Sequence, residues 1–350
     1  GSYPDARAGP QGGAYPSAPA PAGSAQDNTP ATVNPSPIPP GAFQEQIPSD
    51  RELADCGAVI GEIGIRNENI FDLSDPKENN WFFRLANGIH VKTQPWVVRG
   101  LLLFKTGDPF NRRLLEESER ILRSHRFFYD AAIRPVAYRD GRVDVEVLTR
   151  DVWTLRFGFR FGRAGGANNL RFNFGELNML GTGIGFQVSL ESTPDRNIFG
   201  IAVDAVPIPT TRVNTRLLYA KYSDGWARGA LIERPFYSLD TRWSAGASYT
   251  DNLSVTTMYG TVDVADQFQV HAKGLNAWVG WSEGLKGRWV RRYTLGFTYD
   301  ESLFSPAPGA VPSGPLPPDR VLAYPWVGFA LQEDSYEKAR NRDQIARTED

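Results

Sequence analysis

Residues 153–162 read Trp-Thr-Leu-Arg-Phe-Gly-Phe-Arg-Phe-Gly, and the fold prediction rests on this stretch. Large apolar side chains occupy every second position, and Thr, Arg or Gly stand between them. A period of two places the apolar side chains on one face of a β-strand and the small or hydrophilic ones on the other. The stretch therefore predicts a long strand with one apolar and one hydrophilic face.

The same alternation returns in residues 184–191, 242–249 and 293–299. With weaker segments included, residues 152–350 are predicted to hold about ten strands of about ten residues, which is long enough to cross a bilayer when tilted. Strands of a soluble β-sandwich usually span about five or six residues. Aromatic residues also gather near the predicted strand ends, at Trp153, Tyr219, Tyr222, Trp226, Trp243 and Tyr249. We therefore favour an antiparallel transmembrane β-barrel over a sandwich.

Residues 57–151 have a globular pattern instead. An apolar strand is predicted near residues 59–65. The segment 71–92 begins with loop-forming residues, continues with the aromatic residues 81–83, and is interpreted as an insertion. Thr93 is the expected N-cap of a helix over 96–104, with Pro95 in its first turn.

A second helix and a hairpin complete this module. Asn111 is the expected N-cap of the helix. Its apolar stripe consists of Leu114, Leu115, Ser118, Ile121 and Leu122, the spacing of one buried face. Asp140-Gly141 then predicts a tight turn between strands at 131–138 and 143–148. The expected order is strand, helix, helix, strand, strand, an α+β module.

Residues 1–48 are expected to be a disordered linker, because they hold eleven of the 26 prolines and few large apolar groups. The 38 Lys and Arg residues nearly balance the 40 Asp and Glu residues, which gives no electrostatic case for a nucleic-acid partner. Cys56 is the only cysteine, and the three histidines are far apart in sequence. We therefore expect no metal site, no cofactor and no enzyme active site.

The segment Gly181-Thr-Gly183-Ile-Gly185 has the glycine content of a nucleotide-binding loop. A predicted strand follows it, so it offers no helix N-terminus to a pyrophosphate group. We interpret it as a turn.

Several motifs together resemble a known family. Residues 117–122, 127–130 and 140–147 look like parts of a POTRA domain, and residues 175–183 resemble a strand turn of BamA-type barrels. Glu233-Arg-Pro-Phe-Tyr237 is similar to strand ends of the same superfamily. The resemblance implies a POTRA module of order β-α-α-β-β followed by a surface-antigen-type barrel of sixteen strands. Because only about ten strands are predicted, we expect the chain to be a fragment with an incomplete barrel.

The resemblance also implies where and how the protein works. It implies a place in the outer membrane of a Gram-negative cell, with the POTRA domain in the periplasm, and a role in insertion, assembly or translocation of other proteins. The expected partners are outer-membrane lipids, unfolded or extended client proteins and periplasmic accessory proteins.

Two groups of site residues follow from this resemblance. The client-binding strand edge of the POTRA sheet would be Ala131, Ile133, Val136 and Tyr138, with Pro135 removing one main-chain donor. The first barrel strand, a candidate gate, would carry Trp153, Leu155, Phe157, Phe159 and Phe161. Two alternatives stay open: the carrier part of an autotransported enzyme such as a patatin-type phospholipase, and a soluble β-rich binding protein.

Overall fold

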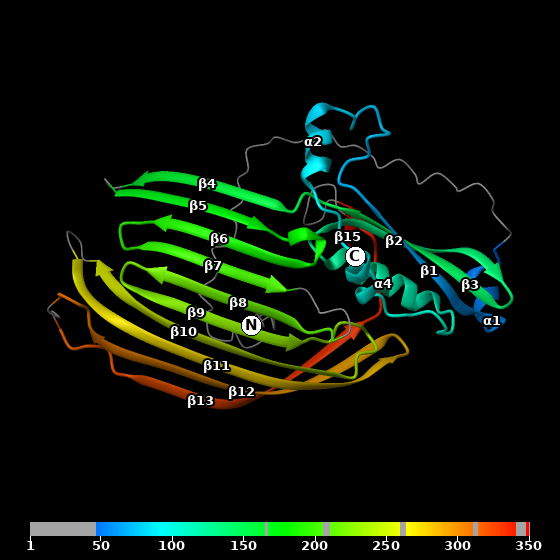
Figure 1. Cartoon of the computed structure of the whole chain (residues 1–350). Helices are drawn as coiled ribbons and strands as arrows, with labels where there is room; N and C mark the ends of the chain where they lie inside the picture. The colour runs from blue at the N-terminus through cyan, green and yellow to red at the C-terminus, as the bar shows by residue number, and fades with distance from the viewer. Residues whose placement is uncertain are drawn as a thin grey trace, which may run out of the picture.

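A computed structural model describes residues 47–164, 167–205, 211–259, 264–310, 314–340 and 348–349. The expected linker over residues 1–48 therefore lies almost entirely outside the described residues. Two bodies of different construction are visible: a small domain with a three-stranded sheet, and a ten-stranded sheet (Figure 1).

The small domain has one central strand flanked by two others. Its elements are α1 (Asp50–Asp55), β1 (Val59–Glu68), α2 (Trp81–Ile89), α3 (Pro95–Leu101), α4 (Arg112–Ser124), β2 (Phe128–Arg139) and β3 (Arg142–Asp151). The sheet order is β1-β3-β2, with β1 parallel and β2 antiparallel to β3. Alternate residues of β3 face α4, and their side chains form a core with Leu115, Leu122 and Ile133.

The turn between β2 and β3 has the predicted geometry. Asp140 and Gly141 have φ angles of 50° and 76°, so both adopt the left-handed region that a type I′ turn needs. The apolar stripe of α4 is also present, since Leu115, Ser118 and Leu122 are buried.

Two local predictions in this domain need correction. Residues 81–89, for which no helix or strand was predicted, form helix α2, whose N-cap Asn80 accepts a hydrogen bond from the main-chain N–H of Phe83. Helix α3 ends at Leu101 rather than 104, and its N-cap is Gln94 rather than Thr93. The Thr93 hydroxyl is used elsewhere: it donates to Asp151 at 2.9 Å and accepts from the Asn178 side chain at 2.7 Å.

The large sheet consists of consecutive antiparallel neighbours. Its strands are β4 (Leu155–Ala164), β5 (Ala167–Glu176), β6 (Ile184–Ser192), β7 (Asn197–Ala205), β8 (Asn214–Tyr222), β9 (Gly225–Arg234), β10 (Trp243–Tyr259), β11 (Val264–Lys286), β12 (Trp289–Pro306) and β13 (Arg320–Glu333). A short helix η1 (Met179–Gly181) stands between β5 and β6, and β14 (Ala339–Arg340) pairs with β15 (Thr348–Glu349). The prediction of an antiparallel sheet with about ten strands is confirmed.

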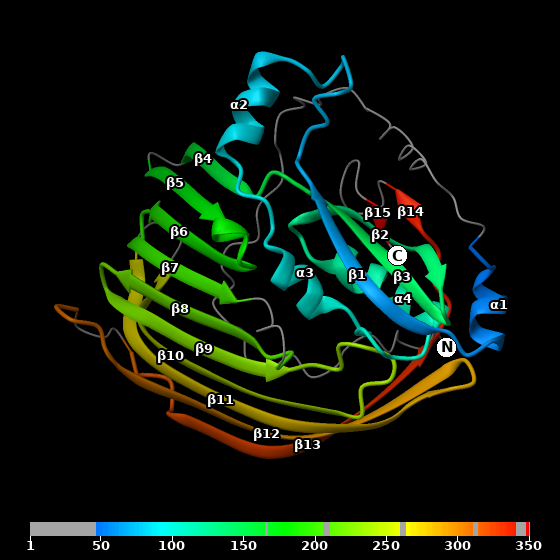
Figure 2. The same cartoon turned by 45° about the vertical axis from the view of Figure 1, so that its right-hand side comes forward.

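Strand lengths differ from the prediction in the second half of the sheet. Strands β4 to β9 have nine or ten residues, whereas β10 to β13 have 14 to 23. The first strand begins at Leu155, so Trp153 lies on the connector before it. The sheet is curved (Figure 2). It does not close in the described residues, since β4 and β13 are its two end strands and do not pair with each other. Among the described helices, none has the length and apolar character needed to cross a membrane, a result without bearing on the strands.

Candidate functional site

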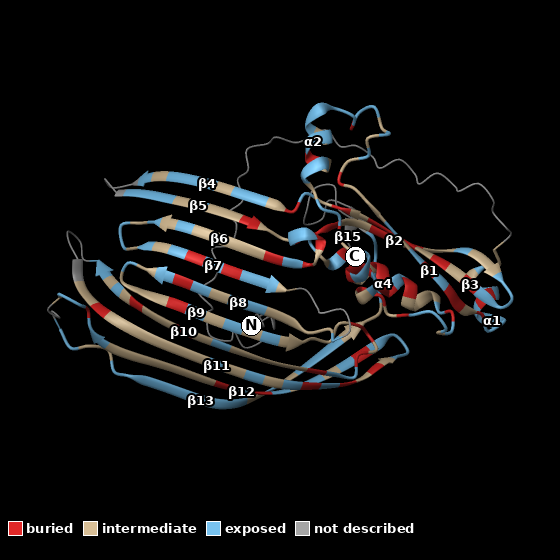
Figure 3. Cartoon of the chain, viewed as in Figure 1, coloured by how far each residue is buried: buried red, intermediate tan, exposed pale blue. Residues whose placement is uncertain are grey.

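The ten-stranded sheet turns one apolar face to its surroundings. Cross-strand register keeps this face continuous: Ala245 pairs with Val279, which pairs with Leu295, which pairs with Val327. We call its exposed apolar side chains the belt. They are Phe157, Phe159, Phe161, Leu170, Phe172, Ile184, Leu190, Phe199, Ile201, Val203, Leu217, Tyr219, Ile232, Trp243, Tyr249, Leu275, Val279, Trp281, Tyr293, Leu295, Phe297, Val327, Phe329 and Leu331. Figure 3 shows that these strands contain fewer buried residues than the strands of the small domain.

Four aromatic members of the belt form a row at the near end of the sheet, the end that faces the small domain. Trp243 pairs with Trp281, Trp281 with Tyr293, and Tyr293 with Phe329. Ring centroids of the last two pairs are 5.8 Å and 5.3 Å apart. Rows of Trp and Tyr at one level are typical of membrane–water interfaces.

The belt gives way to charged residues toward the far end. The next position after Tyr249 on the same face is Asp251, which pairs with Lys273. Arg228, Tyr249 and His271 donate to the Asp251 carboxylate at 2.8 to 2.9 Å. The belt on β10 thus ends at a buried carboxylate whose hydrogen bonds come from protein donors.

The opposite face carries small and hydrophilic side chains. In the middle of β10 and β12 it includes Ser244, Gly246, Ser248, Thr250, Thr294, Gly296 and Thr298. Two indoles interrupt it: Trp278 lies over Gly246 and Trp326 over Gly296, where a Cβ would overlap the rings. This composition suits a hydrated interior.

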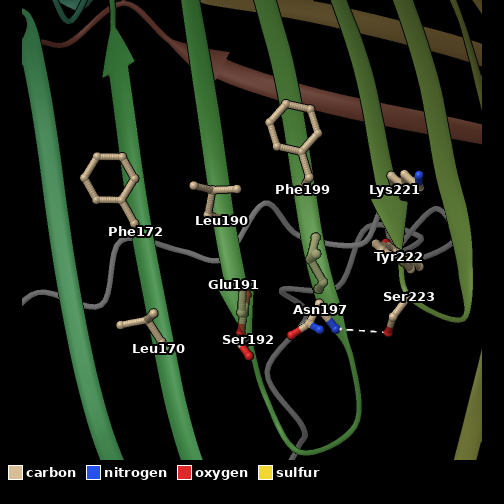
Figure 4. Close-up of a pocket in the computed structure, with 11 residues that line it drawn as sticks. Leu170, Phe172, Leu190, Glu191, Ser192, Asn197, Phe199, Lys221, Tyr222 and Ser223 are labelled. Carbon is tan, nitrogen blue, oxygen red and sulfur yellow. Dashed lines mark hydrogen bonds between the residues drawn. The ribbon is translucent and has the colours of Figure 1, made fainter.

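A shallow hollow of about 460 Å³ lies on β5 to β8 (Figure 4). Its walls include Phe172, Leu190 and Phe199 of the belt, with Lys221 and Tyr222 at the end of β8. Because belt side chains form most of its apolar wall, we treat it as part of the apolar face rather than as a separate ligand site.

A buried polar cluster, which we call the joint, ties the small domain to the sheet. The Asp151 carboxylate, at the end of β3, accepts from the main-chain N–H of Thr93 at 2.7 Å and from Asn67 at 3.2 Å, and lies 3.0 Å from His90 Nε2. Asn178, in the turn between β5 and β6, donates to the Thr93 hydroxyl at 2.7 Å. The donors satisfy a carboxylate that has no contact with water.

The glycine-rich segment predicted as a turn forms the other half of this joint. Gly181 and Gly183 have φ angles of 72° and 76°, and the main-chain N–H of Gln94 donates to the Gly181 carbonyl at 2.8 Å. A Cβ at Gly181 would overlap the carbonyl oxygen of Lys92. The glycine therefore permits main chain to lie directly on main chain.

Helix α4 makes a second connection, to the turn between β9 and β10. Glu117 accepts from the main-chain N–H of Leu239 at 2.6 Å and pairs with Arg113 at 3.1 Å. Arg113 also pairs with Asp240 in that turn. Burial raises the pKa of the Glu117 carboxyl above its ordinary value, and the Leu239 N–H and Arg113 oppose this shift.

The predicted client-binding residues lie on β2, an end strand of the small sheet. Two outer main-chain groups already have partners on α4: Ile133 N–H donates to Glu119 at 2.8 Å, and the Ala131 carbonyl accepts from Arg123 at 2.7 Å. Pro135 has no N–H. A client strand at this edge would have to displace α4 side chains.

The remaining predicted residues on β2 differ in exposure. Val136 is partly exposed, and the Tyr138 hydroxyl lies 3.4 Å from Cys56 Sγ. Ala131 and Ile133, in contrast, are buried under α4.

The predicted gate residues lie on a different kind of edge. Strand β4 pairs only with β5, so its other edge has no strand partner in the described residues. Phe157, Phe159 and Phe161 are 78%, 71% and 62% exposed, while Leu155 opens the strand. Sequence reasoning found this strand through its alternation but missed both connections, because hydrogen bonds between segments some 60 to 120 residues apart leave no periodic signal.

No group of three or more His, Cys, Asp or Glu side chains that could hold a metal ion occurs in the described part of the chain. No protein-family model and no curated protein matches this sequence. The structure is similar to solved structures of BamA from Haemophilus ducreyi lacking POTRA domains 1–3, and of CdiB from Acinetobacter baumannii. Each is 11% identical with a TM-score of 0.36, over 69% and 82% of this chain respectively. The chain spans 56% of the length of each.

Proposed function

We propose that this chain is part of an outer-membrane β-barrel protein of the BamA-like superfamily that assists insertion, assembly or translocation of other proteins. The observation that carries the proposal is the belt. Burial of apolar surface is worth about 25 cal/mol per Å², and monomeric soluble proteins rarely expose apolar patches beyond a few hundred Å². A belt that crosses ten strands needs an apolar solvent, which argues against the soluble binding protein.

The small domain supports the same proposal. With α1 and α2 set aside, its elements follow the order β-α-α-β-β, and its sheet order is β1-β3-β2. This is the order that we associate with a POTRA domain, and the connections at Asp151 and Glu117 hold it at one end of the sheet. In the proposed orientation that end faces the periplasm.

The proposed mechanism is pairing of a client strand with a strand of this chain, and it requires no covalent chemistry. An edge of β4 offers unpaired main-chain donors and acceptors to an extended client segment, with hydrogen bonds that do not depend on the client's sequence. The edge of β2 is the weaker candidate, because Glu119 and Arg123 occupy its main-chain groups. We therefore assign client pairing to β4.

Adjacent proline substitutions test this assignment. Neighbouring residues of a strand direct their N–H groups to opposite edges, so of Gly158→Pro and Phe159→Pro only one removes a donor from the free edge. The full chain is reconstituted in phospholipid vesicles, and insertion of a urea-denatured barrel protein is followed by its protection from protease. We expect one variant to keep heat-modifiable gel mobility but lose client insertion. Wild-type insertion rates in both variants, with the fold intact, would overturn the role of β4.

A further inference from the structure

Helix α2 has an apolar side that the small domain does not use. Trp81, Phe82, Leu85 and Ile89 are 72%, 57%, 51% and 60% exposed. At 3.6 residues per turn these four side chains fall within about 100° of arc, so they form one stripe.

A different side of α2 packs on its own domain. Phe83 stacks on Phe71 with ring centroids 3.9 Å apart, and Ala86 is buried. The Asn87 side chain donates to the Phe71 carbonyl at 2.8 Å. The stripe is therefore not needed to hold the helix in place, and no described residue covers it.

The end of α2 is fixed beside the start of the large sheet. Its C-cap His90 lies 3.0 Å from Asp151, two residues before Trp153 on the connector to β4. Figures 1 and 2 both show α2 standing away from the three-stranded sheet and next to the near end of β4. Trp153 on the connector and Leu180 on η1 are also exposed, at 40% and 62%. The stripe thus lies at the same end as the aromatic row of the belt.

We infer that α2 lies in the membrane surface on the small-domain side, with the stripe inserted among the lipid chains. The inference rests on the proposed function, because it needs the belt to be in lipid. A helix of nine residues is too short to span a bilayer, but a stripe of Trp, Phe, Leu and Ile is typical of helices that lie in the interface. Arg84 lies outside the stripe, about 60° around the helix from Trp81, and is exposed. A lipid anchor here fixes the tilt of the small domain against the membrane.

A single-cysteine labelling experiment tests the inference on the full chain. Cys56 is replaced by Ser, and an environment-sensitive fluorophore is attached at Phe82→Cys or Leu85→Cys on the stripe. Matched controls are Arg84→Cys outside the stripe on α2, Val136→Cys on β2 and Val279→Cys in the belt. The proteins are reconstituted in vesicles of phosphatidylethanolamine and phosphatidylglycerol, with or without a nitroxide-labelled phospholipid.

We expect blue-shifted emission and loss of intensity to the nitroxide lipid at positions 82, 85 and 279, and weak or no quenching at 84 and 136. Quenching at 279 with water-like emission at 82 and 85 overturns the anchor and leaves the proposed function standing. Water-like emission at 279 overturns the proposed function together with the anchor. Blue-shifted emission at 82 that lipid does not quench, and that grows with protein density, assigns the stripe to a second copy of the chain and also overturns the anchor.

Discussion

The small domain and the ten-stranded sheet bury opposite kinds of side chain. In the small domain Val143, Val145 and Val147 of β3 are fully buried. In the large sheet the comparable aliphatic residues, such as Val279 and Leu295, are more than half exposed. Apart from Phe268 and Val290, its buried positions hold small or polar residues, among them Ala202, Ser244, Asp251 and Ser282.

The difference is the one expected if the two bodies lie in two different solvents, as the proposed function requires. A water-soluble domain places apolar groups inside, as the small domain does. The large sheet has the alternation of a strand with lipid on one side and water on the other. The boundary falls at the connector after Asp151, where the joint holds the two bodies together.

The largest expected effect is in the interior of the small domain. Leu122 on α4 is fully buried, so Leu122→Ala should lower the free energy of unfolding by about 2–5 kcal/mol. Leu295→Ala, on the exposed face of β12, should cost much less, because its surroundings refill with lipid. Denaturant unfolding of both variants in vesicles measures the two values. Equal losses in the free energy of unfolding would mean that Leu295 is buried by protein, which would contradict the difference between the two bodies.

A charge placed in the belt should have the next largest effect. Leu295→Arg is expected to cost about 2–4 kcal/mol in lipid, since a charged side chain near the bilayer centre loses its hydration. Thr294→Arg is the matched control, because its side chain faces the hydrophilic side of the same strand. Folding yields and unfolding curves in vesicles compare the two variants. If Thr294→Arg is the more harmful, the two faces have been assigned the wrong way round.

The joint should show a smaller and more local effect. Asp151→Asn leaves fewer acceptor sites for the N–H of Thr93 and for His90, and hydrogen bonds to a charged group are worth about 1.5–3 kcal/mol. We expect faster amide exchange at residues 177–183 and 92–94, while the core of the small domain stays protected. Glu68→Gln, in an exposed pair with Arg66, is the control. A global loss of protection would show that the joint belongs to the domain core instead.

The smallest expected effect is a pH dependence at Glu117. Its pKa is raised in the folded state by burial, so its contribution is fully present below the ordinary value of 4.5 and is lost as pH rises through the folded pKa. The free energy of unfolding should therefore rise as the pH falls from neutrality through the folded pKa. Denaturant unfolding at a series of pH values measures this. Glu117→Gln should flatten the curve, and an unchanged curve would assign the titration to another group.

Sequence alone predicted the elements whose signal is local and periodic. Alternation located the strands, and Asp140-Gly141 located the hairpin with its two left-handed residues. Helix α2 was missed because only nine residues carry its pattern, and because Phe83 and Trp81 face different surroundings. Neither the joint nor the bond from Glu117 to Leu239 could be predicted, since each depends on how two separately patterned bodies meet in space.

Gly181 sets the distance between these bodies at the thickness of two main chains. Any side chain there would act as a wedge between the two bodies, because a Cβ would overlap the carbonyl oxygen of Lys92. If such a wedge turned the small domain as a rigid body, atoms far from the joint would be displaced more than atoms beside it. The residue with the least volume in the joint therefore constrains the angle at which the two bodies meet.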